Sequence, residues 1–162
     1  ALRQKELTGE IIRNHVSGHL KVAPEHLHPR VLNLMRKGQP GELEAFMKLF
    51  EQCCREAGKE QYLIPLFISN FPGCTEQEMK VVDNFLERHH WSPQQVQDYI
   101  PLPMTMGAAM YYSGRNPYTG EELEVHRGLR ERRPQIQMLK KKRPSQYRKD
   151  PTRDRKPRDK HR

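Results

Sequence analysis

The sequence lacks an apolar run that could cross a membrane, since a spanning helix needs about 20 mostly apolar residues and no run approaches that length. Its N-terminus also lacks the charged, apolar and small-residue order of a signal peptide. Both absences argue against the membrane-spanning and secreted classes. We therefore expect a soluble, cytoplasmic protein that makes no membrane contact.

Cysteine is scarce as well. The chain has three cysteines, of which Cys53 and Cys54 are adjacent and Cys74 stands alone. This number and spacing give neither a disulfide framework nor a CxxC metal motif. Reduced thiols are the expectation, which fits the cytoplasm.

Net charge is absent from most of the chain and concentrated at its end. The overall formal charge is +9, and residues 140–162 alone hold 12 Lys/Arg against 3 Asp/Glu. Those residues also contain no Leu, Ile, Val or Phe. A segment of this kind cannot bury a core, so we predict a disordered basic tail over 140–162. The basic pI therefore does not identify the preceding neutral part as a nucleic-acid-binding domain.

Residues 1–139 show alternating strand and helix signals. Predicted strands cover 18–23, 61–69 and 96–100, and the apolar run Gln61–Ser69 is typical of a strand buried on both faces. Predicted helices cover 1–15, 28–38 and 42–57, and another follows the capping box Thr75–Glu78. Shorter helical signals lie at 108–112 and 129–139. Strands separated by helices, without hairpin signals, favour an α/β fold with a parallel sheet.

Three such βα units are too few for a closed barrel, and an open three-stranded sheet would leave an edge and apolar surface uncovered. We therefore expect the chain to be part of a larger βα structure. The predicted division is a half-barrel with the start of an extension over 1–125, a weak helix over 126–139 and the tail over 140–162.

Three stretches of the sequence carry a family resemblance. They are His15–His26 with Val31–Arg36, Gln61–Ser69 with Phe71–Thr75, and Gln95–Thr105 with Ala109–Tyr112. In this order and spacing they resemble the YgiQ-type proteins of the radical S-adenosylmethionine (SAM) superfamily, over roughly residues 10 to 120.

The resemblance implies a partial (β/α)6 TIM-like barrel, of which the chain looks like the second half. The missing N-terminal half would carry the Cys-x3-Cys-x2-Cys motif that holds a [4Fe–4S] cluster, and nothing in this chain replaces that motif. SAM and the cluster are thus implied cofactors of a full-length protein. No cofactor and no activity are expected for this chain alone, and the substrate is unknown.

The resemblance also implies site residues, because the loops after the strands of a barrel converge on one mouth. By position, Glu25 lies where relatives contact the cofactor ribose, and Lys37 where a basic residue lies near the methionine carboxylate. Ser69 and Asn70 precede the turn Phe71–Pro72, which in relatives backs the adenine.

Three further residues are implied to face the substrate: Lys21, His26 and Met104. No catalytic residue is identified.

Other interpretations of the same residues stay open. The cluster His15, His19, Glu25, His26 and His28 suggests a metal site, but no spacing fixes four ligands, so we expect none. Glu25 with His26 would also suit an acid/base pair. The alternative function is a non-catalytic interaction module that binds RNA or another polyanion through the basic tail, with salt-sensitive affinity.

Overall fold

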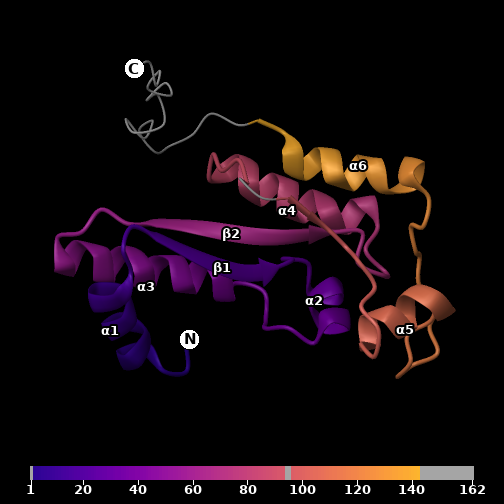
Figure 1. The fold of residues 1–162 in the computed structure, drawn as a ribbon, viewed down its shortest axis with the longest axis horizontal. Coiled ribbons are helices and arrows are strands. Elements are labelled where there is room, and N and C mark those ends of the chain that lie inside the picture. Colours follow the sequence, from indigo (N-terminus) through magenta and orange to yellow (C-terminus); the bar gives the residue numbers. More distant parts are fainter. Residues whose placement is uncertain (1, 94–95, 143–162) are drawn as a thin grey trace, which may run out of the picture.

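The computed structural model describes residues 2–93 and 96–142, which form a three-stranded parallel sheet with surrounding helices (Figure 1). The strands lie in the order β1, β2, β3 and are β1 (His19–Glu25), β2 (Tyr62–Ser69) and β3 (Val96–Asp98). The helices are α1 (Lys5–His15), α2 (Pro29–Met35), α3 (Glu42–Ala57), α4 (Glu76–Arg88), α5 (Met106–Ser113) and α6 (Leu129–Lys140). The predicted α/β class and parallel strand pairing are confirmed.

The helix boundaries follow local signals. The Thr75 side chain accepts a hydrogen bond from the Gln77 N–H, and the Glu78 carboxylate accepts one from the Thr75 N–H at 2.9 Å, so the predicted capping box begins α4. Gly58, with φ +60°, ends α3 as expected. The prediction that Gly38 ends the preceding helix is wrong, because Arg36 already adopts the left-handed conformation and caps α2.

Strand β2 differs from the expectation of burial on both faces. Its residues alternate between buried and half-buried along the whole strand. The buried face carries Leu63, Pro65 and Phe67, of which Leu63 and Phe67 belong to the hydrophobic core. Pro65 is therefore compatible with the strand, despite its missing donor.

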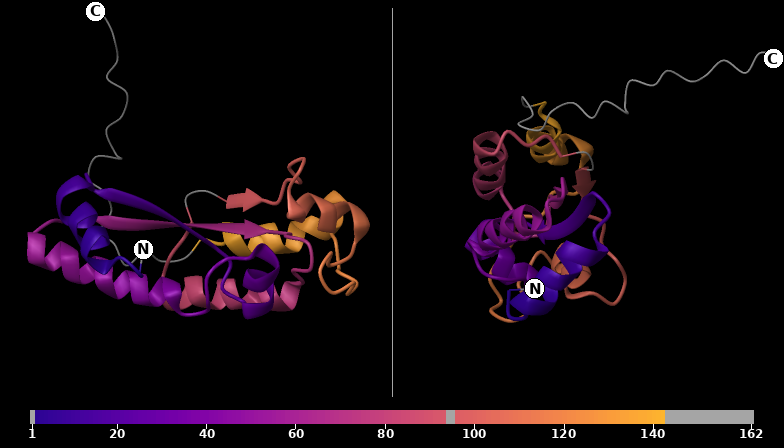
Figure 2. Two further views of the ribbon diagram at one scale, coloured as in Figure 1. Left: turned by 90° about the horizontal axis from the view of Figure 1, so that it is seen from below. Right: turned by 90° about the vertical axis from the view of Figure 1, so that its left-hand side faces the viewer.

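Helices α3 and α4 lie on the same side of the sheet, as the right-hand view of Figure 2 shows. Their apolar faces bury Met47 and Phe50 of α3 and Val82 and Phe85 of α4. The opposite face of the sheet carries Lys21, which pairs in register with Ile64. The chain thus has one covered and one open sheet face, which is consistent with half of a βα barrel.

The open face predicts dye binding. The described surface around Ala23, Ile64 and Leu66 is an apolar depression, so the isolated chain should enhance the fluorescence of an apolar dye such as anilinonaphthalene sulfonate. Replacing both Ile64 and Leu66 with Lys should remove most of that signal. The control Leu129→Lys changes an exposed leucine of α6. Equal dye signals from all three proteins would contradict the prediction.

Two sequence predictions concern other parts of the chain. No helix within residues 2–93 and 96–142 is long and apolar enough to cross a membrane. Residues 143–162 of the predicted basic tail lie outside the described residues, so its disorder and its RNA contact stay predictions.

Helix α6 packs against α4, β2 and β3.

Candidate functional site at the carboxyl edge of the sheet

The carboxyl ends of the three strands meet at one edge of the sheet. Glu25 at the end of β1 pairs in register with Phe67, and Ser69 at the end of β2 pairs with Asp98 at the end of β3. In parallel βα folds the loops at this edge form the binding site. The structure therefore brings the loops singled out by sequence to a common edge.

Glu25 and Lys37 form an ion pair at this edge, with 2.9 Å between the Lys37 Nζ and a Glu25 carboxylate oxygen. A register shift between Val22 and Glu25 and a left-handed Glu25 backbone (φ +64°) turn the chain out of β1. The left-handed Arg36 ends α2 and turns the chain so that Lys37 lies against the end of this helix. There the Lys37 N–H donates to the Leu32 carbonyl at 2.9 Å. Both side chains stay partly exposed, so the pair is open to a ligand.

Ser69 and Asn70 are buried rather than on an open surface. The Ser69 hydroxyl and the Asn70 amide both donate to one Asp98 carboxylate oxygen, at 2.9 and 2.7 Å. The other Asp98 oxygen pairs with Arg132 of α6 at 2.8 Å. Ser69 and Asn70 therefore bond to β3 from inside the chain, and they do not line an open concave surface.

The turn after Asn70 is firmly packed. Phe71 is buried and meets the Tyr99 ring edge-on, with 5.0 Å between centroids, and Pro72 is fully buried. Gly73 continues the turn with φ +82°. The turn is thus a rigid apolar segment at the carboxyl end of β2.

His26 lies in the interior and not in an open mouth. Its side chain is 1% exposed. The His28 N–H donates to His26 Nδ1 at 3.0 Å, so a neutral ring carries its proton on Nε2, which lies 3.4 Å from the Cys74 sulfur. Burial, followed by the charge of His28, lowers the pKa of His26 to about 4. We expected His26 to face a substrate from an open surface. The structure differs, because Cys74, 48 positions later in the chain, covers the ring.

The remaining predicted residues are exposed. Lys21 lies on the open face of β1. Met104 is fully exposed in the loop after β3, with a left-handed backbone (φ +65°). Both are accessible to a ligand, and neither contacts the Glu25–Lys37 pair through any described polar bond.

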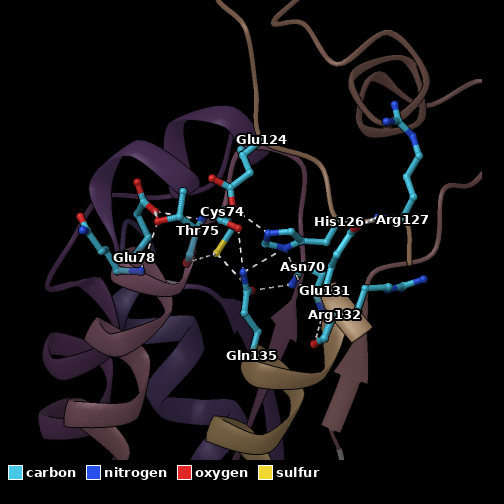
Figure 3. A network of polar contacts seen from close by, with 12 residues as sticks. Asn70, Cys74, Thr75, Glu78, Glu124, His126, Arg127, Glu131, Arg132 and Gln135 are labelled. Atoms are coloured by element: carbon cyan, nitrogen blue, oxygen red, sulfur yellow. Dashed lines mark hydrogen bonds and ion pairs between the residues drawn. The ribbon is translucent and has the colours of Figure 1, made fainter. Parts of the chain in front are cut away.

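Sequence reasoning missed a polar network behind this edge, which Figure 3 shows. Gln135 of α6 bonds to both ends of the loop Asn70–Cys74, and His126 lies with Nδ1 3.1 Å from the Asn70 side-chain oxygen and Nε2 2.6 Å from Glu124. No local motif marks these residues. Asp98 lies inside the predicted strand 96–100, and only the structure shows that the strand ends there.

The cysteines do not fit an iron–sulfur cluster. Cys53 is buried in α3, Cys54 donates to Gln61 at 3.3 Å, and Cys74 is enclosed with His26. No group of three or more His, Cys, Asp or Glu side chains in residues 2–93 and 96–142 is arranged to hold a metal ion. The structure therefore gives the chain's own cysteines no role as cluster ligands, and any histidine metal site near Glu25 would need ligands from outside those residues.

These environments predict the order of thiol reactivity. Burial raises the pKa of Cys74 to about 12, and Cys53 is also buried, whereas Cys54 is half-buried. Because the thiolate is the reactive form, a disulfide reagent at pH 8 should modify Cys54 first and the other two only after unfolding. Cys54→Ala should abolish the fast phase. Fast labelling of Cys74 in the folded chain would contradict the buried placement.

Comparison with known proteins identifies homologues. A family model described as a domain of unknown function (DUF3362) matches residues 94–150. A UPF0313 protein of Methanocella arvoryzae is 39% identical over 147 residues, which cover 91% of this chain and 24% of that protein. UPF0313 proteins of Bacteroides thetaiotaomicron (45% over 134 residues; 83% and 22%) and Geobacter sulfurreducens (41% over 137 residues; 85% and 23%) are similar too. The chain thus spans about a quarter of the length of the curated relatives it matches.

Proposed function

We propose that this chain acts as a segment of a longer UPF0313-like protein, in which it forms the second half of a radical SAM barrel. UPF0313 proteins are homologous to the chain over most of its length, which supports the first part of this proposal. In this proposal the missing N-terminal half covers the open face of the sheet and supplies the cluster ligands. The carboxyl edge of this chain then binds SAM. The substrate is not identified by this chemistry.

The observation that carries the proposal is the Glu25–Lys37 pair. The resemblance alone singled out both residues. Glu25 ends β1 and Lys37 follows α2, and they are in contact at the edge where parallel βα folds bind ligands. The Lys37 ammonium can pair with the methionine carboxylate of SAM, and the Glu25 carboxylate can accept bonds from its ribose hydroxyls. The residues present therefore fit SAM, whereas they do not fit the cluster.

The chain's other residues at this edge would orient the ligand. The turn Phe71–Pro72 is buried, so it would fix the backbone at this edge and not offer its own side chains as a surface for the adenine. The exposed Met104 and Lys21 would border the space left for a substrate. The bound cofactor would supply radical chemistry, and these residues would bind it, orient it and exclude water.

The test uses a chimera, in which this chain replaces the matching 147-residue stretch of the Methanocella arvoryzae protein. Lys37→Met and Glu25→Ala should each raise the Kd for SAM by about tenfold or more, as expected when a charge-assisted contact is lost. The matched control is Arg13→Met, which breaks the partly exposed Arg13–Glu56 pair between α1 and α3. This control should leave the Kd unchanged.

A second measurement uses the chimera, because the chain alone is not expected to bind the cofactor. SAM should slow hydrogen exchange at the amides of Glu25 and Lys37 and leave that of Glu56 unchanged. Unchanged affinity in both chimera variants, or protection confined to other residues, would overturn the proposal.

A further inference from the structure

The loop Asn70–Cys74 after β2 is held by residues that lie 56 to 65 positions later in the chain. Gln135 is 0% exposed. Its side-chain oxygen accepts the Asn70 N–H at 2.8 Å, and its side-chain nitrogen donates to the Cys74 carbonyl at 2.7 Å. One side chain of α6 therefore binds both ends of the loop.

The Asn70 side chain is held by the same part of the chain. Its amide nitrogen donates to the Arg132 carbonyl at 3.0 Å as well as to Asp98, and its oxygen faces His126 Nδ1 at 3.1 Å. Asn70 adopts a left-handed backbone (φ +58°), which costs free energy for any residue with a side chain. These bonds offset that cost and fix the direction in which the chain leaves β2.

The middle of the loop is tied to this part of the chain too. The Gly73 N–H donates to the Glu124 carbonyl at 2.8 Å. The contacts from Asp98, Glu124, His126, Arg132 and Gln135 all come from residues within the DUF3362 match. That match thus contributes strand β3 to the sheet and also the groups that hold the neighbouring loop.

We propose that Gln135 and His126 are positioning residues for cofactor binding: α6 and the segment before it hold the loop Asn70–Cys74, and the Cys74 sulfur lies 3.4 Å from the ring of His26, the residue after Glu25. This inference rests on the proposed function, because it presumes that the Glu25–Lys37 pair, which this loop backs through His26, binds SAM. It assigns a role to the DUF3362 match, which would be an integral part of the binding site and not a separate module. Neither residue touches the cofactor.

The decisive variant is Gln135→Met, which keeps the length of the side chain and removes both hydrogen bonds. The matched control is Leu139→Ala, which opens a cavity one turn further along α6, where Leu139 is also fully buried. In the 162-residue chain, Gln135→Met should speed hydrogen exchange at the Asn70 amide by about tenfold relative to the Phe50 amide of α3. Leu139→Ala should speed both amides together.

The second readout is SAM affinity in the chimera. Gln135→Met should raise the Kd by about tenfold, and Leu139→Ala should leave it within about twofold of the wild-type value. His126→Leu removes the contacts of His126 with the Asn70 oxygen and Glu124 but keeps the bonds of Gln135 to the loop, so it should give a smaller increase of about threefold. This variant provides the test if Gln135→Met fails to fold.

The two proposals fail separately. A wild-type chimera that does not bind SAM would refute the proposed function and with it the positioning role, whatever hydrogen exchange shows about the loop. If the chimera binds SAM, an unchanged Asn70 exchange ratio in Gln135→Met would overturn the inference, as would a Kd that Leu139→Ala raises equally.

Discussion

Acidification from pH 7 to pH 4 should lower the free energy of unfolding by about 3 kcal/mol through His26 alone. Burial lowers the pKa of His26 from 6.5 to about 4, and the unfolded chain therefore takes up a proton before the folded chain does. The contribution of the neutral ring is fully present above pH 6.5 and is lost as the pH falls toward 4. Protonation would also place a hydrogen on Nδ1 of His26, so that two N–H groups would face each other where the His28 N–H now donates to Nδ1.

Urea unfolding at a series of pH values measures this effect. His26→Gln should lose stability less steeply than the wild-type chain between pH 6.5 and pH 4. Leu139→Ala keeps His26 and should retain the full pH dependence at a lower overall stability. Identical pH profiles for wild type and His26→Gln would show that the ring is not enclosed with Cys74.

Gly73→Ala should destabilise the chain by about 2 to 4 kcal/mol, which combines a left-handed backbone cost with overpacking. Gly73 has φ +82°, and a Cβ there would lie 2.7 Å from Leu34 Cδ1 and 3.1 Å from Leu123 Cδ2. The loop cannot move aside easily, because Gln135 holds it at Asn70 and Cys74.

Gly58 supplies the matched control for this change. It also has a positive φ of +60°, but no atom lies within 4 Å of a Cβ built on it. Gly58→Ala should therefore cost only about 1 kcal/mol, the backbone part alone. Equal losses for the two variants in chemical unfolding would mean that the Gly73 turn is not packed against α2.

Local chemistry explains which parts of the fold could be predicted from the sequence. Thr75 with Glu78 marks the start of α4, and the apolar spacing of residues 42–57 followed by Gly58 marks α3, because these signals act within a few residues. The parallel sheet follows from the order of the elements. Burial was harder to predict, since β2 has one half-exposed face that only the arrangement of the helices reveals.

The candidate site divides in the same way. Glu25 and Lys37 came from a family resemblance, and their contact depends on two left-handed residues, Glu25 and Arg36, whose types do not demand that conformation. His26 looked like a loop residue because the residue that covers it, Cys74, is far away in sequence. Gln135 and His126 could not be predicted, since their partner Asn70 lies 65 and 56 positions earlier.

The radical SAM assignment is tested most directly by SAM cleavage in the chimera with the Methanocella arvoryzae protein, after iron–sulfur reconstitution and with dithionite as the reductant. We predict that both the parent protein and the chimera release methionine and 5′-deoxyadenosine, and that Lys37→Met slows release by about tenfold at subsaturating SAM. Cleavage by the parent but not by a folded chimera would contradict the role of this chain. Release of neither product by either protein would contradict the radical SAM assignment itself.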